Sequence, residues 1–277
     1  MGFETSRRGF LVSAGALGLA PLRGEKTNNG GDDLKLAVAT YSLREFQRDL
    51  AIKTIKELGV RYVSIKEYHL PYNDTPKQLA LGRKRFEDAG LDIAGGGVVY
   101  MLQDDDADIR RYFDYAKACG MPMMAIGPTA ETMPRIERFV KEYNIKVAIH
   151  NHGPEDKHFP TPQSALRVVK DMDSRCGLCI DVGHTARAGV DVVESIQEAG
   201  SRLFDMHIKD MRAVTGKDSG CPVGEGVLPI VAMFKQLKKM NYSGTVSLEY
   251  EVEADSPFTG MKASFAYMRG VLAGLRG

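Results

Sequence analysis

The sequence predicts an α/β protein that folds as a single (β/α)8, or TIM, barrel. Short apolar runs alternate with longer segments of helical period from residue 34 onward, which indicates a parallel sheet. About eight such runs are present, the number of strands that closes a barrel. The first run leads into Tyr41-Ser42-Leu43, and not into the glycine-rich phosphate turn of an open, doubly wound sheet.

Each predicted strand is an apolar run bounded by polar residues or glycine. In chain order the predicted strands are residues 36–41, 62–65, 91–100, 121–126, 146–151, 177–182, 203–208 and 245–250. The intervening segments are long enough for the crossover helices that parallel strands require.

The predicted helices carry recognisable start and stop signals. Segments 50–58 and 76–89 are followed by Gly59 and Gly90, which supply the left-handed residue that ends many helices. Thr161-Pro162 begins another helix, with proline in the first turn. Segment 230–240 places its apolar residues at helical spacing, as expected of a helix that packs on the core.

Composition favours one large core and a small-molecule pocket. The 277 residues are 43% hydrophobic, and 37 Lys and Arg against 36 Asp and Glu leave a net charge of +1. A net charge this close to zero therefore creates no overall electrostatic field that would attract nucleic acid or an anionic membrane surface. The four cysteines are too few for a disulfide framework, and Cys176-x-x-Cys179 lies in a predicted strand, which favours packing over a redox role.

The N-terminus resembles an export signal. Ser6-Arg7-Arg8-Gly9-Phe10-Leu11 precedes an apolar run through Ala20, a pattern typical of twin-arginine signals, although that run is too short for a stable membrane span. We therefore interpret residues 1–33 as signal and linker and residues 34–277 as the barrel. The expected location is periplasmic or otherwise exported, and cytoplasmic if the signal does not function.

Four consecutive predicted strands direct an imidazole or a carboxylate towards the barrel interior. Alternation turns their apolar residues outward to the helices and sends the intervening residues inward. The inward side chains that we expect to share one metal are His150, Asp181, His207 and Glu249, with His152 as substitute for His150. Mixed imidazole and carboxylate ligands suit a divalent cation, and Mn, Co, Mg and Zn are the candidates.

The motifs that contain these residues resemble those of a known family. His150-Asn151-His152, Asp181-Val182-Gly183-His184, Met206-His207-Ile208-Lys209-Asp210 and Ser247-Leu248-Glu249-Tyr250-Glu251 resemble the xylose-isomerase-like barrel superfamily of sugar-phosphate isomerases and epimerases. That superfamily includes ketose 3-epimerases, inosose dehydratases and endonuclease IV. The resemblance extends over the chain from about residue 34 and implies a metal-dependent enzyme.

Two positions depart from the ketose epimerases. Those enzymes use two metal-bound glutamates on opposite faces of the substrate; here Glu249 keeps one place and His150 takes the other. Lys66 lies on the second strand where the epimerases usually carry a glutamate. A lysine beside a cation can become a neutral base, and an interior lysine can equally pair with Asp181 or Glu249.

Further polar residues near the strand ends are candidates for contact with substrate. His184 follows Asp181 and is a candidate catalytic residue with Glu249, His150 and Lys66. The candidate substrate-binding residues are His152, His69, Tyr41, Arg187 and Lys209.

The reaction implied by the resemblance is proton abstraction next to a carbonyl through an enediolate, in a sugar isomerase or epimerase. A lyase, dehydratase or hydratase acting on a keto-sugar or 3-keto-glycoside would use the same metal site. A non-catalytic sugar-binding barrel would keep the pocket without needing Glu249. The expected partner is a small sugar or keto-sugar, without nucleic acid or a stable membrane span; a homo-oligomer is compatible with the sequence.

Overall fold

The computed structural model of the chain describes residues 1–2, 34–215 and 219–276. Residues 34–215 and 219–276 belong to one compact unit. The predicted export signal, residues 1–33, lies outside the described residues apart from Met1 and Gly2. None of the described helices is long and apolar enough to cross a membrane.

Parallel strands close into a barrel, as the sequence predicts. The order around the closed sheet is β1-β10-β7-β6-β5-β4-β3-β2. These barrel strands are β1 (Lys35–Ala39), β2 (Tyr62–Ile65), β3 (Asp92–Met101), β4 (Met123–Pro128), β5 (Lys146–His150), β6 (Cys176–Asp181), β7 (Leu203–Ile208) and β10 (Thr245–Leu248). A short antiparallel pair, β8 (Asp210–Met211) and β9 (Gly220–Cys221), follows β7.

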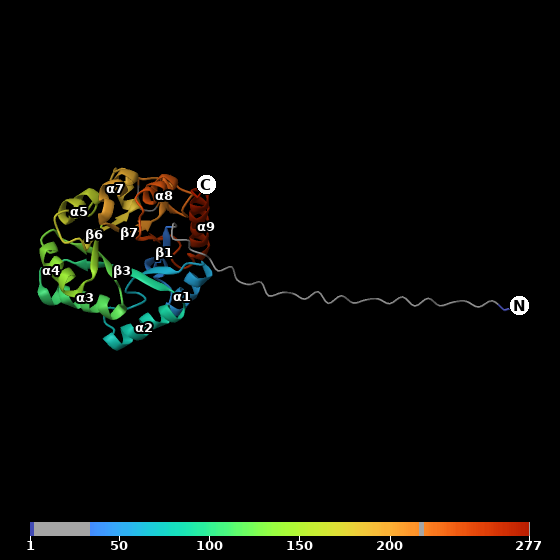
Figure 1. Ribbon diagram of the computed structural model, residues 1–277, viewed down its shortest axis with the longest axis horizontal. Helices are drawn as coiled ribbons and strands as arrows, with labels where there is room; N and C mark the ends of the chain where they lie inside the picture. Colours follow the sequence, from blue (N-terminus) through green and yellow to red (C-terminus); the bar gives the residue numbers. More distant parts are fainter. Residues whose placement is uncertain (3–33, 216–218, 277) are drawn as a thin grey trace. The chain divides into compact units, whose positions relative to one another are not determined.

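Helices surround the strands (Figure 1). They are α1 (Arg48–Glu57), α2 (Pro76–Asp88), α3 (Asp106–Cys119), α4 (Met133–Tyr143), α5 (Pro162–Val169), α6 (Val182–Arg187), α7 (Val192–Ala199), α8 (Ile230–Lys239) and α9 (Phe258–Gly274). Two 3₁₀ turns, η1 (Thr40–Leu43) and η2 (Gly200–Arg202), follow β1 and precede β7.

The predicted helix signals act as expected. Gly59 and Gly90 have φ angles of 65° and 78°, in the left-handed region that glycine adopts at low cost. Thr161 caps α5, and its Oγ1 accepts a hydrogen bond from Ser164 N at 3.2 Å. These local signals, together with the apolar runs, explain why the observed strands begin and end within about two residues of the predicted bounds.

The strands separate two layers of packing. Their outward side chains, such as Val147 and Ile149 of β5, join the large core between sheet and helices. A smaller inner group, consisting of Val98, Met123, Ala125, Ala148 and Cys179, fills part of the barrel interior. Cys176 belongs to the outer core and Cys179 to the inner group, so the pair does not form a disulfide.

Candidate metal centre and active site

Neighbouring strands position the predicted ligands. β10, β7, β6 and β5 are adjacent in the closed sheet. In the register, Asp181 is paired with His207, and His150 is paired with Cys179, two residues before Asp181. Because the strands are parallel, their carboxyl ends meet at the same mouth of the barrel. The sheet therefore brings together side chains that are up to about 100 residues apart in the sequence.

The four predicted ligand residues form one buried cluster. One potential ligand atom from each of His150, Asp181, His207 and Glu249 lies within 4.8 Å of the others. Nε2 of His150 lies 3.0 Å from Nδ1 of His207 and 3.6 Å from Oδ2 of Asp181. Nδ1 of His207 lies 3.2 Å from Oε2 of Glu249. The structure thus assembles the donor set that the strand ends predict.

The donor atoms of this cluster fit a divalent cation. Oδ2 of Asp181 is fully buried and accepts no hydrogen bond of normal geometry; it pairs with the Lys209 ammonium at 2.9 Å, while Oδ1 accepts a hydrogen bond from His184 N at 2.8 Å. Buried carboxylate oxygens are rarely left without such a partner unless they pair with or bind a cation. Two imidazoles and two carboxylates match the ligand preferences of Mn²⁺, Co²⁺ and Zn²⁺.

Burial and neighbouring charges set the protonation of the cluster. Burial lowers the pKa of His150 to about 3, so this imidazole is neutral and able to bind a metal. Burial alone would raise the pKa of Asp181, but Lys209 and His184 outweigh it and hold that pKa well below its usual value. His207 and Lys209 likewise outweigh burial at Glu249 and lower its pKa. Both carboxylates are therefore ionised at neutral pH.

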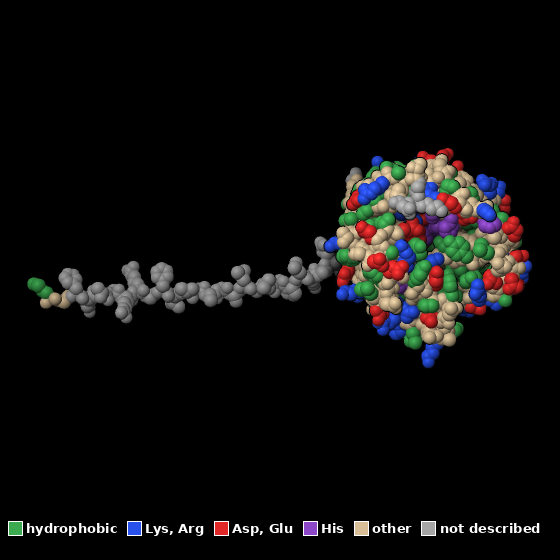
Figure 2. Space-filling view, turned by 180° about the vertical axis from the view of Figure 1, so that it is seen from behind, with side chains coloured by type: hydrophobic (Ala, Val, Ile, Leu, Met, Phe, Trp, Pro, Cys, Tyr) green, Lys and Arg blue, Asp and Glu red, His purple; other side chains and the backbone are tan. Residues whose placement is uncertain are grey.

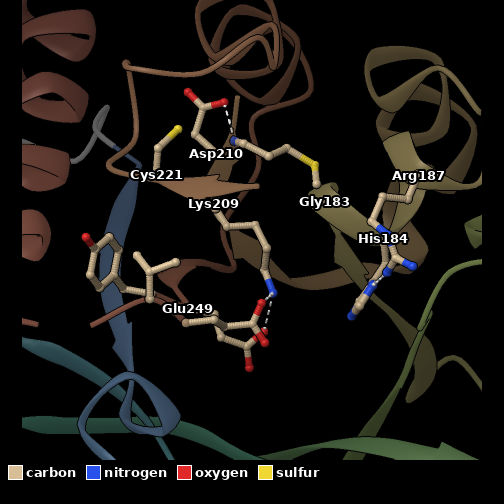
Figure 3. Close-up of a pocket in the computed structure, with 12 residues that line it drawn as sticks. Gly183, His184, Arg187, Lys209, Asp210, Cys221 and Glu249 are labelled. Atoms are coloured by element: carbon tan, nitrogen blue, oxygen red, sulfur yellow. Dashed lines mark hydrogen bonds and ion pairs between the residues drawn. The ribbon is translucent and has the colours of Figure 1, made fainter. Parts of the chain in front are cut away.

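Lys209 links the two carboxylate ligands. Its Nζ lies 2.9 Å from Oδ2 of Asp181, 2.9 Å from Oε2 of Glu249 and 2.6 Å from Oε2 of Glu251. Figure 3 shows the Lys209 side chain directed towards Glu249. Gly183 makes room for this side chain, since a Cβ there would lie 2.8 Å from Lys209 Cδ. Burial alone would lower the pKa of Lys209, but the three carboxylates raise it well above its usual value. Lys209 is thus an ammonium that orients and partly neutralises the candidate ligands.

We expect Lys209→Met to destabilise the metal-free chain by about 3 kcal/mol, because it leaves Asp181 and Glu249 as buried charges without their ammonium partner. Saturating Mn²⁺ should reduce the difference in the free energy of unfolding between the variant and the wild type, since a bound cation supplies the missing positive charge. Urea unfolding of the two proteins without Mn²⁺ measures the loss of stability, and the same experiment with Mn²⁺ measures how much of that loss the cation restores. Lys66→Met is the control, and an equal loss with and without Mn²⁺ would contradict the expectation.

The structure separates Lys66 from the cluster. Its Nζ donates a hydrogen bond to the Val98 carbonyl at 2.7 Å and lies 3.4 Å from Oε2 of Glu67. Lys209, and not Lys66, therefore pairs with Asp181 and Glu249, which corrects the pairing considered for Lys66 from the sequence. Nζ of Lys66 lies 5.9 Å from the Tyr100 ring centroid. A catalytic role for Lys66 stays a prediction.

His69 does not lie with the other predicted substrate-binding residues. It is fully buried in the turn after β2, and its Nε2 lies 3.2 Å from the Phe46 carbonyl oxygen. Burial lowers its pKa to about 4. The apolar alternation that placed it near a strand end does not reveal that this turn folds inward.

The lowered pKa of His69 predicts a loss of stability in acid. The unfolded chain binds a proton at this histidine near pH 6.5, whereas the folded chain binds it only near pH 4. Because of this group, the free energy of unfolding therefore falls by about 2 kcal/mol as the pH is lowered from about 7 to about 5. Urea unfolding of the wild type and of His69→Gln over that range measures the contribution; equal slopes in the two proteins would contradict it.

The remaining predicted contacts surround a cavity of about 750 Å³ at the barrel mouth. Its lining includes Tyr41, Tyr100, His152, His184 and Arg187. Figure 2 shows histidine atoms in a hollow of one face beside a group of hydrophobic atoms. The cavity is large enough for a small organic ligand, and such sites combine apolar walls with a few polar groups.

Hydrogen bonds hold the imidazoles and the guanidinium at this cavity. Nε2 of His152 lies 3.1 Å from the Tyr100 hydroxyl, and the two rings are stacked. Nδ1 of His184 lies 3.2 Å from Arg187, which also pairs with Glu155. The partner Glu155 makes Arg187 a less available anion ligand than its loop position alone suggests.

Sequence reasoning did not assign Cys179 to the site. Cys179 is fully buried and forms a potential metal-ligating group with His150 and His207. The same alternation that sends Asp181 inward sends the residue two positions earlier inward. The sequence pattern therefore predicts an inward Cys179, which the interpretation of both cysteines as packing residues does not use.

Comparisons with known proteins identify the family of this chain. A family model described as "Xylose isomerase-like TIM barrel" matches residues 52–271. The putative L-ribulose-5-phosphate 3-epimerase SgbU of Escherichia coli K12 is 36% identical over 77 residues, 26% of this chain and 27% of that protein. The chain spans less than half the length of the curated relatives it matches, 41% and 27%.

Solved structures share the fold. The IOLI protein with a bound zinc atom has a TM-score of 0.73 and 18% identity, over 87% of this chain and 99% of that chain. The probable 3-DHS dehydratase AsbF of Bacillus anthracis has a TM-score of 0.69 and 14% identity, over 85% and 99%. At these identities the likeness shows the fold alone. The family match covers most of the barrel, and the chain belongs to the xylose isomerase-like TIM barrel family.

Proposed function

We propose that this chain is a divalent-metal-dependent enzyme that removes a proton from the carbon next to a carbonyl of a sugar or keto-sugar, as an isomerase or epimerase does. The observation that carries the proposal is the buried cluster of His150, Asp181, His207 and Glu249, whose His150 ring lies 4.4 Å, centroid to centroid, from the ring of His152 in the lining of the cavity of about 750 Å³. A buried set of four ionisable groups is costly to maintain for packing alone.

The cluster residues would hold the cation. When bound, a divalent cation polarises a carbonyl oxygen and stabilises the charge that develops as the neighbouring C–H bond breaks. Mn, Co, Mg and Zn are the candidates, and the histidine content favours the transition metals and zinc.

Glu249 is the proposed base. Its carboxylate is ionised because His207 and Lys209 keep its pKa low against the effect of burial. Its residue surface is 8% exposed, so its proton transfers occur where bulk water is largely excluded. Lys209 holds the Glu249 carboxylate by a hydrogen bond of 2.9 Å and fixes its orientation.

The substrate contacts follow from the cavity lining. Tyr41 and Tyr100 offer aromatic faces to a sugar ring, and His152 and His184 offer ring nitrogens to its hydroxyl groups. A small sugar or keto-sugar is therefore the proposed ligand. Export by the N-terminal segment stays a prediction, and it would favour unphosphorylated sugars.

Elimination is the second candidate reaction. His150 occupies the place where the ketose epimerases carry a second metal-bound glutamate, so the cluster contains one glutamate rather than two. One base and one acid suffice for loss of a β-oxygen, and Lys209 is an ammonium held beside Glu249. A lyase, dehydratase or hydratase acting on a keto-sugar or 3-keto-glycoside fits this arrangement. A non-catalytic sugar-binding barrel would not require the low pKa of Glu249.

Hydrogen exchange in D₂O tests the proposal. The Mn²⁺- or Co²⁺-loaded chain should exchange a carbon-bound proton of at least one keto-sugar in a panel followed by NMR, and Asp181→Asn should not. Exchange accompanied by release of water or of an aglycone would select elimination over epimerisation. Sugar binding without exchange of any carbon-bound proton would exclude the enzyme and leave the binding barrel.

A further inference from the structure

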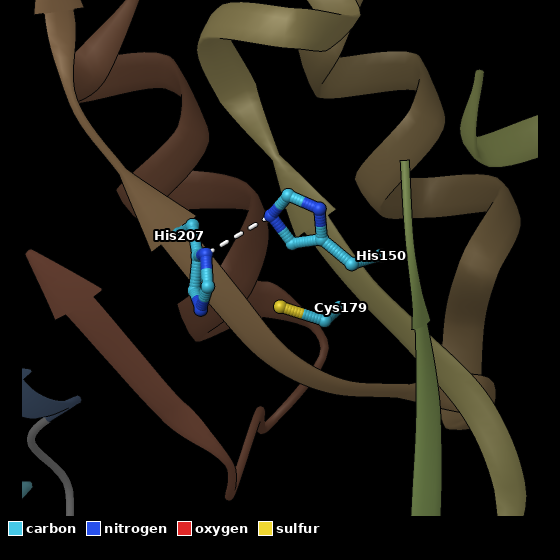
Figure 4. A group of neighbouring side chains, drawn as sticks. All are labelled: His150, Cys179 and His207. Atoms are coloured by element: carbon cyan, nitrogen blue, oxygen red, sulfur yellow. Dashed lines mark hydrogen bonds between the residues drawn. The ribbon is translucent and has the colours of Figure 1, made fainter. Parts of the chain in front are cut away.

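Cys179 places a sulfur atom against the two histidines of the cluster. One potential ligand atom from each of His150, Cys179 and His207 lies within 4.8 Å of the others. Figure 4 shows the cysteine sulfur directed towards the two imidazole rings, which His150 Nε2 and His207 Nδ1 join at 3.0 Å. Nδ1 of His207 also lies 3.2 Å from Oε2 of Glu249, so Nε2 is the nitrogen of His207 that is left for a further ligand.

A second observation separates this sulfur from an ordinary buried cysteine. Nε2 of His207 is buried and makes no hydrogen bond of normal geometry, although such nitrogens are normally paired, and the Cys179 thiol interacts with the same imidazole. A buried free cysteine usually acts as a small apolar residue, and Cys176 on the same strand does so in the outer core. Cys179 instead lies inside the barrel, beside an imidazole with an unpaired nitrogen.

We propose that His150, Cys179 and His207 form an inner, sulfur-containing donor set for a borderline or soft cation such as Zn²⁺. The two histidines are shared with the outer carboxylate set of Asp181 and Glu249. This inference rests on the proposed function, because it concerns which cation the same centre takes and at which depth.

The chemistry of the two donor sets differs. Carboxylate oxygens suit Mg²⁺ and Mn²⁺, whereas a thiolate strongly favours Zn²⁺ and other softer ions. Cys179 is fully buried, and a buried cysteine sulfur is a thiol until a metal binds. A coordinating thiol is deprotonated outright, and its proton passes to solvent without any change of oxidation state.

The position of Cys179 deeper in the barrel affects how a bound ion can contact the carboxylates. Cys179 precedes Asp181 by two residues on the same inward face of β6, which places it one layer further from the barrel mouth. Because one ion cannot make full use of both sets, an ion drawn to the sulfur gives up carboxylate contacts near the substrate. Zn²⁺ should therefore bind more tightly than Mn²⁺ while supporting less turnover.

Cobalt spectroscopy on the full chain tests the inner set. Co²⁺ added to the metal-free protein should give a near-ultraviolet thiolate-to-cobalt charge-transfer band. Cys179→Ala should lose this band while retaining about one equivalent of Co²⁺ on the outer set, and Cys176→Ala, the matched control on the same strand, should keep it. Circular dichroism confirms folding, and Cys179→Ser replaces the alanine variant if that variant does not fold.

Competition between Zn²⁺ and Mn²⁺ gives an independent readout. Cys179→Ala should lower the preference for Zn²⁺ over Mn²⁺ by about tenfold or more, with unchanged Mn²⁺ affinity. Bound Co²⁺ without a thiolate band in the wild type, or a band that survives in Cys179→Ala, would overturn the inner set and leave the proposed function standing. Failure of the wild type to bind any of these cations would overturn both.

Discussion

Replacing Asp181 by asparagine is expected to lower the affinity of the chain for Mn²⁺ by more than about a hundredfold, beyond the loss that changes around a metal site usually cause. Oδ2 of Asp181 is buried and lies 2.9 Å from the Lys209 ammonium and 3.6 Å from Nε2 of His150, within the cluster. Asparagine keeps an oxygen that can accept the His184 N–H and cap α6. The substitution therefore removes the charge while preserving the local fold, and equilibrium dialysis followed by elemental analysis measures the loss.

Asp205→Asn is the matched control for Asp181→Asn. Asp205 is also a fully buried carboxylate inside the barrel, but its Oδ1 accepts hydrogen bonds from Thr245 and Ser247 and it does not belong to the cluster. Its substitution should leave Mn²⁺ affinity within a factor of about three. Equal losses in the two variants would mean that the cation binds through general interior charge and not through Asp181.

Glu249→Gln is expected to lower the rate of carbon-bound hydrogen exchange by about a thousandfold, the effect of removing a positioned general base. Glutamine has nearly the same shape but cannot take up the substrate proton. Loss of a ligand charge will also weaken metal binding, so the rate is measured at saturating Mn²⁺, where the remaining deficit reports proton transfer.

Glu251→Gln controls for charge near the Glu249 site. Glu251 contacts the same ammonium, at 2.6 Å, but its side chain is 44% exposed and it lies outside the cluster. Exchange in that variant should stay within about tenfold of wild type. An undiminished rate in metal-saturated Glu249→Gln would exclude Glu249 as the base and direct attention to His184 or Lys66.

The positions of the ligands could be predicted because they depend on strand alternation. Val147 and Ile149 must face the helices, and that requirement alone sends His150 inward. The same argument places Asp181, His207 and Glu249, and the parallel order then brings all four to one mouth. The apolar pattern therefore contains most of the information that builds the cluster.

The partners of the long side chains could not be predicted. Lys66 and Lys209 both follow strands, yet only Lys209 lies beside Gly183, where the absence of a Cβ lets its chain reach Asp181. His69 is buried by a turn whose direction depends on the Phe46 carbonyl and not on any periodic pattern. These outcomes depend on how flexible side chains and irregular backbone pack in three dimensions.

Anomalous diffraction from a crystal of the full chain loaded with Mn²⁺ locates the cation. We expect one strong peak among His150, Asp181, His207 and Glu249, about 2.0–2.3 Å from their ligand atoms. A fully loaded crystal with its peak elsewhere, or with no peak inside the barrel, would contradict the claim that these four side chains hold the cation.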